Sequence, residues 1–102
     1  MRKDVATEFQ AFREEGDRLM RTDPRDLMPI LGPTIDEWNR EAREWIDAAE
    51  KHVQTHMGSS EAYMFRTCGQ VYPTNTPWEV KQKLAKLRLI TGRYLAREDA
   101  SA

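Results

Sequence analysis

Apolar residues recur every three or four positions between residues 34 and 57, the longest regular pattern in the chain. That spacing places them on one side of an α-helix, with charged residues on the other side. Thr34 and Glu37 have the spacing of a capping box, and Gly58 suits the residue that follows a helix. The pattern predicts one amphipathic helix over 34–57, with an apolar face made of Ile35, Trp38, Ala42, Trp45, Ile46, Ala49, Val53 and Met57.

A second apolar seam lies near the N-terminus and predicts a helix over about 4–21. Its members alternate at spacings of four and three, which suits packing along another helix. Gly16 lies inside this seam, where glycine costs roughly 1 kcal/mol of helix propensity relative to alanine. We therefore expect a bulky ring, from Trp38 or Trp45, to approach closely there. The seam consists of Val5, Phe9, Phe12, Gly16 and Leu19.

Prolines and glycines divide the remainder of the chain. Residues 22–33 hold three prolines and one glycine, which predicts an apolar connector that breaks the helix. A short helix is predicted over about 60–67, capped by Ser59 or Ser60. Thr76 and Glu79 repeat the capping-box spacing around a proline at the first helical position. They predict a last helix over about 77–97, followed by a frayed tail at 98–102.

The last helix carries apolar residues on two sides. Placed at steps of about 100°, one stripe holds Val80, Leu84, Leu87, Thr91, Tyr94 and Leu95. A smaller stripe holds Trp78, Ala85, Leu89 and Ala96. Such a helix is either sandwiched inside its own fold or offers one side to another chain.

Together these segments predict an all-α fold: a small bundle of three main amphipathic helices plus one short helix. The 102 residues fit a single domain spanning 1–102. Charged residues make up 32% of the chain, as suits a small helical protein with a large surface relative to its core. Three Trp, three Tyr and three Phe argue against long disorder.

Charge and cysteine usage narrow the functional classes. The formal net charge of −1 argues against a surface built throughout for nucleic acid. The lone Cys68 cannot form an internal disulfide, so nothing indicates an oxidising compartment. The N-terminus lacks an apolar signal region, and no run approaches the ~18 apolar residues of a membrane span. We expect a cytoplasmic protein with no membrane partner.

Two histidines are the main candidates for chemistry. His52 and His56 are four residues apart on the predicted central helix, a spacing that lets two imidazoles share a metal. The glutamate of an HExxH motif is missing, so Cys68 or Glu61 would have to add a ligand. Two ligands without a matched pair form an incomplete site, so we expect no metal, no cofactor and no catalytic residue. A metal-dependent or thiol enzyme using His52, His56 and Cys68 is the third functional class.

Basic residues on the last helix define a second class. Residues 77–102 hold six Lys and Arg against three Asp and Glu. This excess could follow a phosphate backbone, or it could be an ordinary solvated face near a helix C-terminus. The alternative function is therefore a nucleic-acid-binding regulator using Lys83, Lys86, Arg93 and Arg97.

The surplus of aromatic and apolar residues favours a different class. Trp and Tyr are common anchors of protein interfaces, and the last helix has more apolar positions than one core-facing stripe needs. We expect a small non-catalytic interaction protein, such as an adaptor, regulatory subunit or inhibitor. It would dock on a protein partner or on a copy of itself as a homo-oligomer. The predicted docking residues are Trp78, Leu89, Lys86, Arg93 and Tyr72.

Overall fold

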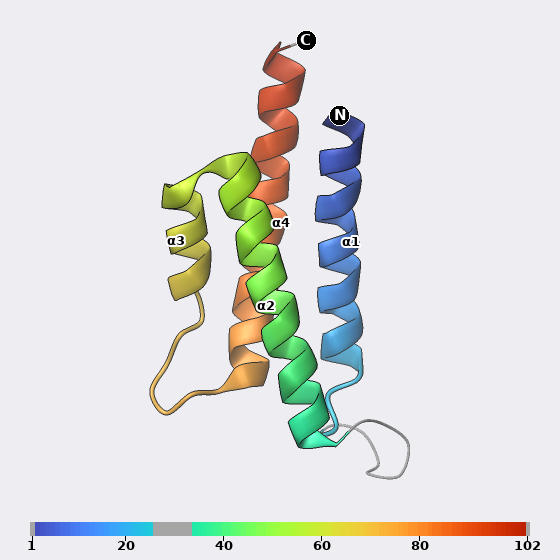
Figure 1. Cartoon of the computed structure of the whole chain (residues 1–102), viewed down its shortest axis with the longest axis vertical. Helices are drawn as coiled ribbons and strands as arrows, with labels where there is room; N and C mark the ends of the chain where they lie inside the picture. The colour runs from blue at the N-terminus through green and yellow to red at the C-terminus, as the bar shows by residue number, and fades with distance from the viewer. Residues whose placement is uncertain (1, 26–33, 102) are drawn as a thin grey trace.

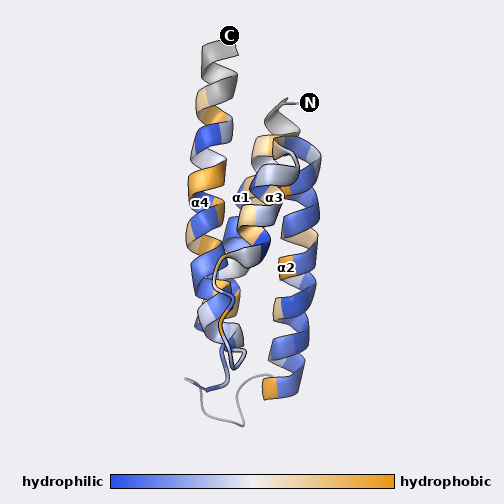
Figure 2. Ribbon diagram, turned by 90° about the vertical axis from the view of Figure 1, so that its left-hand side faces the viewer, coloured by the Kyte–Doolittle hydropathy of each residue, from blue (hydrophilic) through white to orange (hydrophobic). Residues whose placement is uncertain are grey.

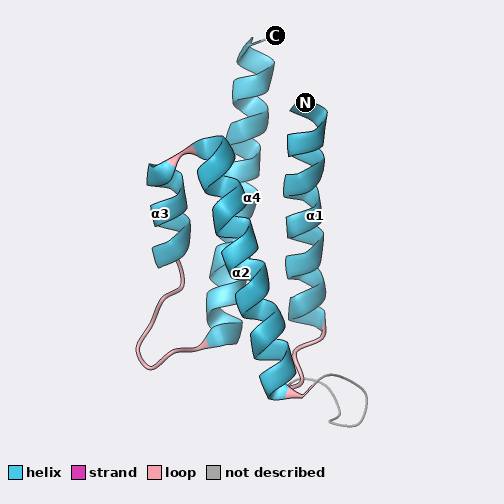
Figure 3. Ribbon diagram, in the orientation of Figure 1, coloured by secondary structure: helices cyan, strands magenta, loops and turns pink. Residues whose placement is uncertain are grey.

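The computed structural model describes residues 2–25 and 34–101, with side chains described for 5–25 and 34–96. This part of the chain forms three long helices and one short helix and contains no strand (Figures 1 and 3). The all-α prediction is confirmed. The helices are α1 (Arg2–Arg21), α2 (Ile35–Met57), α3 (Ser59–Thr67) and α4 (Thr76–Ser101).

The three long helices lie side by side, and α3 covers one edge of them. α1 runs antiparallel to both α2 and α4, so α2 and α4 point in the same direction (Figure 1). α3 folds back along α2 and also contacts α4, but among the described residues it does not contact α1. The loop at 68–75 then carries the chain back to the end of the bundle where α4 begins.

The predicted apolar faces meet in one core between the helices, except that Ile35 of the predicted α2 face is 48% exposed. Trp38, Phe9, Phe65, Leu87 and Val53 are fully buried. The buried stripe of α4 is continuous, although Leu95, which the pattern placed in it, is 45% exposed. Burying large side chains from all four helices supplies the apolar free energy that a chain of this length needs.

The structure shows why residue 16 is a glycine, as the sequence predicted. A Cβ atom at this position would lie 2.8 Å from the Trp45 ring and 2.7 Å from Leu84 Cδ1, both closer than real Cβ contacts. The expectation of a close ring is confirmed for Trp45. Glycine is therefore needed here so that α1, α2 and α4 can approach one another.

Capping follows the sequence at α2 but differs at α4. The Thr34 hydroxyl accepts from the Glu37 amide at 3.1 Å, and the Glu37 carboxylate accepts from the Thr34 amide at 3.2 Å, as predicted. At α4 the Asn75 side chain accepts from the Trp78 amide at 3.1 Å. Asn75 thus takes the capping role predicted for Thr76, while the Glu79 carboxylate pairs with Arg43 of α2 and Lys83 of α4.

The short helix ends at Thr67 as predicted, whereas the start of that helix and the C-terminal end of α4 differ from the predicted boundaries. α3 begins directly after Gly58, whose φ of 94° suits glycine, without a side-chain cap from either serine. α4 continues to Ser101 instead of ending near 97, because residues 96–100 contain good helix formers and no breaker. The predicted connector at 22–33 lies largely outside the described residues.

None of the helices within the described ranges combines the length and apolar character that crossing a bilayer requires.

Candidate functional site

The second apolar stripe of α4 faces away from the rest of the fold. Leu89 is 60% exposed and Trp78 is 44% exposed, and the small residues between and beyond them are exposed as well. Hydrophobic and hydrophilic residues alternate along α4 when the chain is coloured by hydropathy (Figure 2). The stripe therefore lies on the outer face of α4, defined here as Trp78, Ala85, Leu89, Gly92 and Ala96.

Further apolar residues are exposed beside the start of α4. Tyr72 is completely exposed in the loop before this helix, and Val71 next to it is 46% exposed. Tyr63 and Met64 on α3 are also exposed. These side chains are exposed apolar residues outside the core, on α3 and in the loop that follows it.

Lys86 and Arg93 both reach the same carboxylate on α3. Arg93 Nη1 donates to Glu61 Oε1 at 2.9 Å, and Lys86 Nζ lies 3.8 Å from Glu61 Oε2. These ion pairs join α4 to α3 and neutralise one flank of the outer face. On the other flank, Arg88 donates to Asp17 of α1 at 2.8 Å.

Lys83 does not belong to an exposed basic stripe, because its side chain is fully buried. Its ammonium group donates to the backbone carbonyls of Arg66 at 2.8 Å and Cys68 at 2.7 Å, at the C-terminal end of α3. It also lies 2.9 Å from Glu79 Oε2. Lys83 therefore satisfies carbonyls that the end of a helix leaves without partners. Arg97, the last predicted member of the stripe, lies outside the described side chains.

Glu79 links α4 to α2 through its carboxylate. Arg43 of α2 donates to both carboxylate oxygens, and Lys83 pairs with the same group from within α4. Burial alone would raise the pKa of the Glu79 carboxyl. The hydrogen bonds and positive charges of Arg43 and Lys83 outweigh burial, so the pKa of Glu79 lies below its ordinary value.

Ring nitrogens of α2 contact the backbone of α1 at regular intervals. Trp38 Nε1 donates to the Leu19 carbonyl at 2.9 Å, and Trp45 Nε1 donates to the Phe12 carbonyl at 2.8 Å. Each step of seven residues forward along α2 is matched by seven residues backward along α1. His52 is the next ring in this series, opposite Val5.

Unlike the two tryptophans, His52 does not donate a ring N–H to a described backbone carbonyl of α1. Its Nδ1 lies 3.2 Å from Glu8 Oε2, while its buried Nε2 has no hydrogen-bond partner among the described residues. Burial lowers the pKa of His52, and the nearby His56 lowers it further. Glu8 and the Val5 backbone raise the pKa of His52 without reversing the shift.

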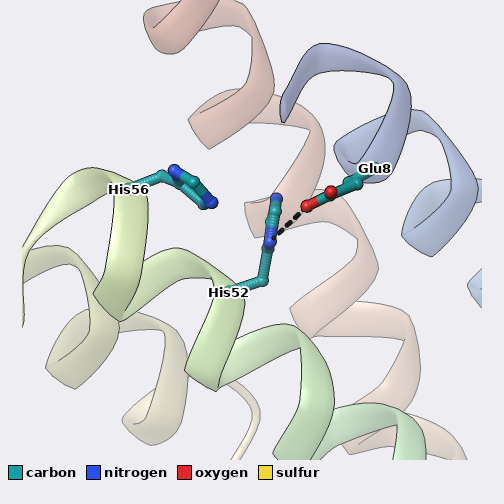
Figure 4. Close-up of side chains that lie close together, drawn as sticks. All are labelled: Glu8, His52 and His56. Atoms are coloured by element: carbon teal, nitrogen blue, oxygen red, sulfur yellow. Dashed lines mark ion pairs between the residues drawn. The ribbon is translucent and has the colours of Figure 1, made fainter. Parts of the chain in front are cut away.

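Glu8, His52 and His56 form a three-residue cluster between α1 and α2 (Figure 4). One donor atom from each side chain lies within 4.8 Å of the other two. The rings of His52 and His56 have centroids 4.4 Å apart, and the Phe9 ring lies 4.5 Å from that of His52. The cluster borders an open groove of about 940 Å³ between α1 and α2.

The structure separates the histidines from the additional ligands that the sequence suggested. Cys68 lies at the end of α3, where its thiol donates to the Gln82 carbonyl at 3.5 Å, and Glu61 faces α4. The histidines instead face α1, which α3 does not contact among the described residues. A site combining His52, His56 and Cys68 is therefore not assembled.

Glu8 is the partner that sequence reasoning missed. It precedes Phe9, a member of the α1 seam, but nothing in the sequence states how α1 is aligned against α2. The two tryptophan hydrogen bonds fix that alignment and bring the first turns of α1 beside His52. To identify Glu8 as the third donor, one would need to know the antiparallel alignment of α1 against α2.

Comparison with known proteins yields no match to a protein-family model, a curated protein or a solved structure. Functional inference therefore depends on the two surfaces described above.

Proposed function

We propose that this chain is a small non-catalytic interaction module that docks the outer face of α4, with a second copy of itself as the occupant. The observation that carries this proposal is the position of Trp78 and Leu89, which lie opposite the buried stripe of the same helix and are exposed. An apolar stripe reaching from Trp78 to Ala96 is about 27 Å long at 1.5 Å per residue. Exposed apolar surface of this extent is typical of an interaction site.

The residue sizes along the outer face favour helix pairing. Gly92 lies inside α4, where glycine costs roughly 1 kcal/mol relative to alanine. Unlike Gly16, it has no described atom within 4 Å of the position a Cβ would take. No contact within the described fold accounts for a glycine there, whereas close approach of a second helix would.

A symmetric antiparallel pair of α4 helices gives Gly92 a specific neighbour. If the two-fold axis passes at Ala85, Trp78 of one copy faces Gly92 of the other, because both residues are seven positions from Ala85. Leu89 then faces the aliphatic stem of Lys81, which lies four positions on the other side. Such an isologous interface places the large Trp78 over the small Gly92 on both copies.

The charges beside this face are compatible with self-association. Arg93 and Lys86 are paired with Glu61, and Arg88 is paired with Asp17, all within one chain. These pairs reduce the repulsion that two basic helices would otherwise experience. They also engage the residues that nucleic-acid binding would require, and Lys83 is buried, so the observations favour protein docking over the nucleic-acid alternative.

The molar mass in solution tests the proposal. Light scattering over a concentration series should show a dimer for the native chain and a monomer for Leu89→Glu, with helicity unchanged by circular dichroism. Leu95→Glu is the matched control: it places the same charge on another exposed leucine of α4, away from the outer face. A native chain that stays monomeric at all concentrations would overturn self-docking.

A second measurement separates protein docking from nucleic-acid binding. Association through the apolar face should change little with salt, whereas phosphate contacts lose affinity steeply as salt increases. Anisotropy of a labelled duplex and a labelled single strand, recorded at low and physiological salt, should reveal no tight binding by the native chain.

A further inference from the structure

We propose that Glu8, His52 and His56 bind one divalent transition-metal ion of the zinc class between α1 and α2. Three donors from two helices converge here, with two imidazoles supplied at positions i and i+4 of α2 and a carboxylate from α1 (Figure 4). Two histidines and one carboxylate are a donor set that zinc and neighbouring first-row ions accept. The site does not depend on the proposed docking of α4, which lies on a different surface.

The hydrogen-bonding state of His52 is the observation that points to a ligand. A neutral imidazole carries one N–H. If the proton is on Nδ1, the buried Nε2 is a lone pair without any donor. If the proton is on Nε2, the Nδ1 lone pair faces a Glu8 oxygen at 3.2 Å, which is also an acceptor. Neither tautomer satisfies both nitrogens.

A cation removes this conflict. With a metal ion between Nδ1 and the Glu8 carboxylate, both acceptors become ligands, and the Nε2 proton can point toward the α1 backbone near Val5. Metal-binding histidines commonly direct their second nitrogen to a backbone carbonyl or carboxylate in this way. A doubly protonated His52 ring could also donate from Nδ1 to Glu8. A metal ion that binds Nδ1 must therefore displace the Nδ1 proton into solvent.

To bind a zinc ion, the three donor atoms need to move only slightly closer together. Donors around a tetrahedral zinc ion lie about 3.3–3.5 Å apart, which is within reach of atoms already no more than 4.8 Å apart. Glu8 is the ligand that can move, since its side chain is 54% exposed, whereas His52 is only 9% exposed and held by Phe9. At least one coordination position would remain open toward the groove between α1 and α2.

Direct zinc binding tests the proposal on untagged protein freed of metal with a chelator. Competition against a chromophoric chelator should give one zinc per chain, and zinc should raise the melting temperature because it binds the folded state. Replacing zinc by Co²⁺ should give visible absorption bands that report imidazole ligation. One zinc per two chains would overturn a site within one chain, as would absence of binding at about 100 μM zinc.

Matched variants decide whether the cluster has three ligands. Glu8→Gln and His56→Gln should each weaken zinc binding at least about 10-fold, while the exposed Glu14→Gln on the same helix should leave it unchanged. His52→Gln is less informative because the ring is packed in the core. Zinc affinity that survives Glu8→Gln would reduce the site to the two histidines and overturn the proposal.

Discussion

Trp45 of α2 lies directly against Gly16 of α1, with the ring carbon Cζ2 2.8 Å from the position that a Cβ atom on the glycine would occupy. The same indole donates its N–H to the Phe12 carbonyl one turn earlier on α1. The ring therefore cannot retreat from the glycine without losing a hydrogen bond. This contact sets how closely the first two helices pack.

Gly16→Ala should destabilise the fold despite its better helix propensity. The added methyl group meets the Trp45 ring, and overpacking of this kind typically costs about 1–3 kcal/mol. The gain in propensity is only about 1 kcal/mol, so we expect a net loss of stability. Urea denaturation followed by circular dichroism measures the difference. An equal or higher midpoint would mean that Trp45 and Leu84 can yield at little cost.

Gly92→Ala should have the opposite effect on the monomer and should weaken the dimer. No described atom lies near the added methyl group, so the helix gains roughly 0.5–1 kcal/mol from the lower entropy of the unfolded chain. In a dimer with Trp78 of the other copy over residue 92, the methyl group would instead obstruct packing. Denaturation at a concentration where the chain is monomeric, and light scattering at higher concentrations, measure the two effects separately.

Gly92→Ala also tests the proposed alignment of the two α4 helices separately from the choice of docking face. If Gly92→Ala stabilises the monomer and leaves association unchanged, while Leu89→Glu still dissociates the dimer, the proposed axis at Ala85 is wrong and the docking face stands.

Glu79 should make stability depend on pH in the acid range. Its pKa in the folded state is lower than in the unfolded chain, where a glutamate titrates near 4.5. The unfolded state therefore takes up the proton first as pH falls. The stabilising contribution is complete above pH 4.5 and is lost as pH falls below it through the folded pKa. Glu79→Gln should have a lower unfolding midpoint at neutral pH and a smaller fall in stability between pH 5 and 3.

The control for this measurement is Glu44→Gln, an exposed carboxylate on α2 for which no charged partner is described. It should retain the native pH profile. If Glu79→Gln retains that profile as well, the ion pairs with Arg43 and Lys83 do not control acid stability.

The sequence alone determined the helices and most of the residues on their buried faces, although Ile35 and Leu95 are exposed. Apolar spacing placed α2 and the buried stripe of α4, and the Thr34 and Glu37 pair placed the start of α2, because these signals act within a few residues along the chain. The position of Gly16 within a seam even indicated a ring contact. Local rules failed where a side chain had a better partner in another helix, as for Glu79, which left the α4 cap to Asn75.

The tertiary structure decided which surfaces are available and which side chains meet. Lys83 and Lys86 both read as basic positions of one helix, yet one is buried against α3 and the other lies at its edge, depending on how α3 folds back. Glu8 joins His52 and His56 because two tryptophan hydrogen bonds fix the register of α1 against α2. Side-chain spacing within a helix is a property of the sequence, whereas the alignment of separate helices results from packing the whole core.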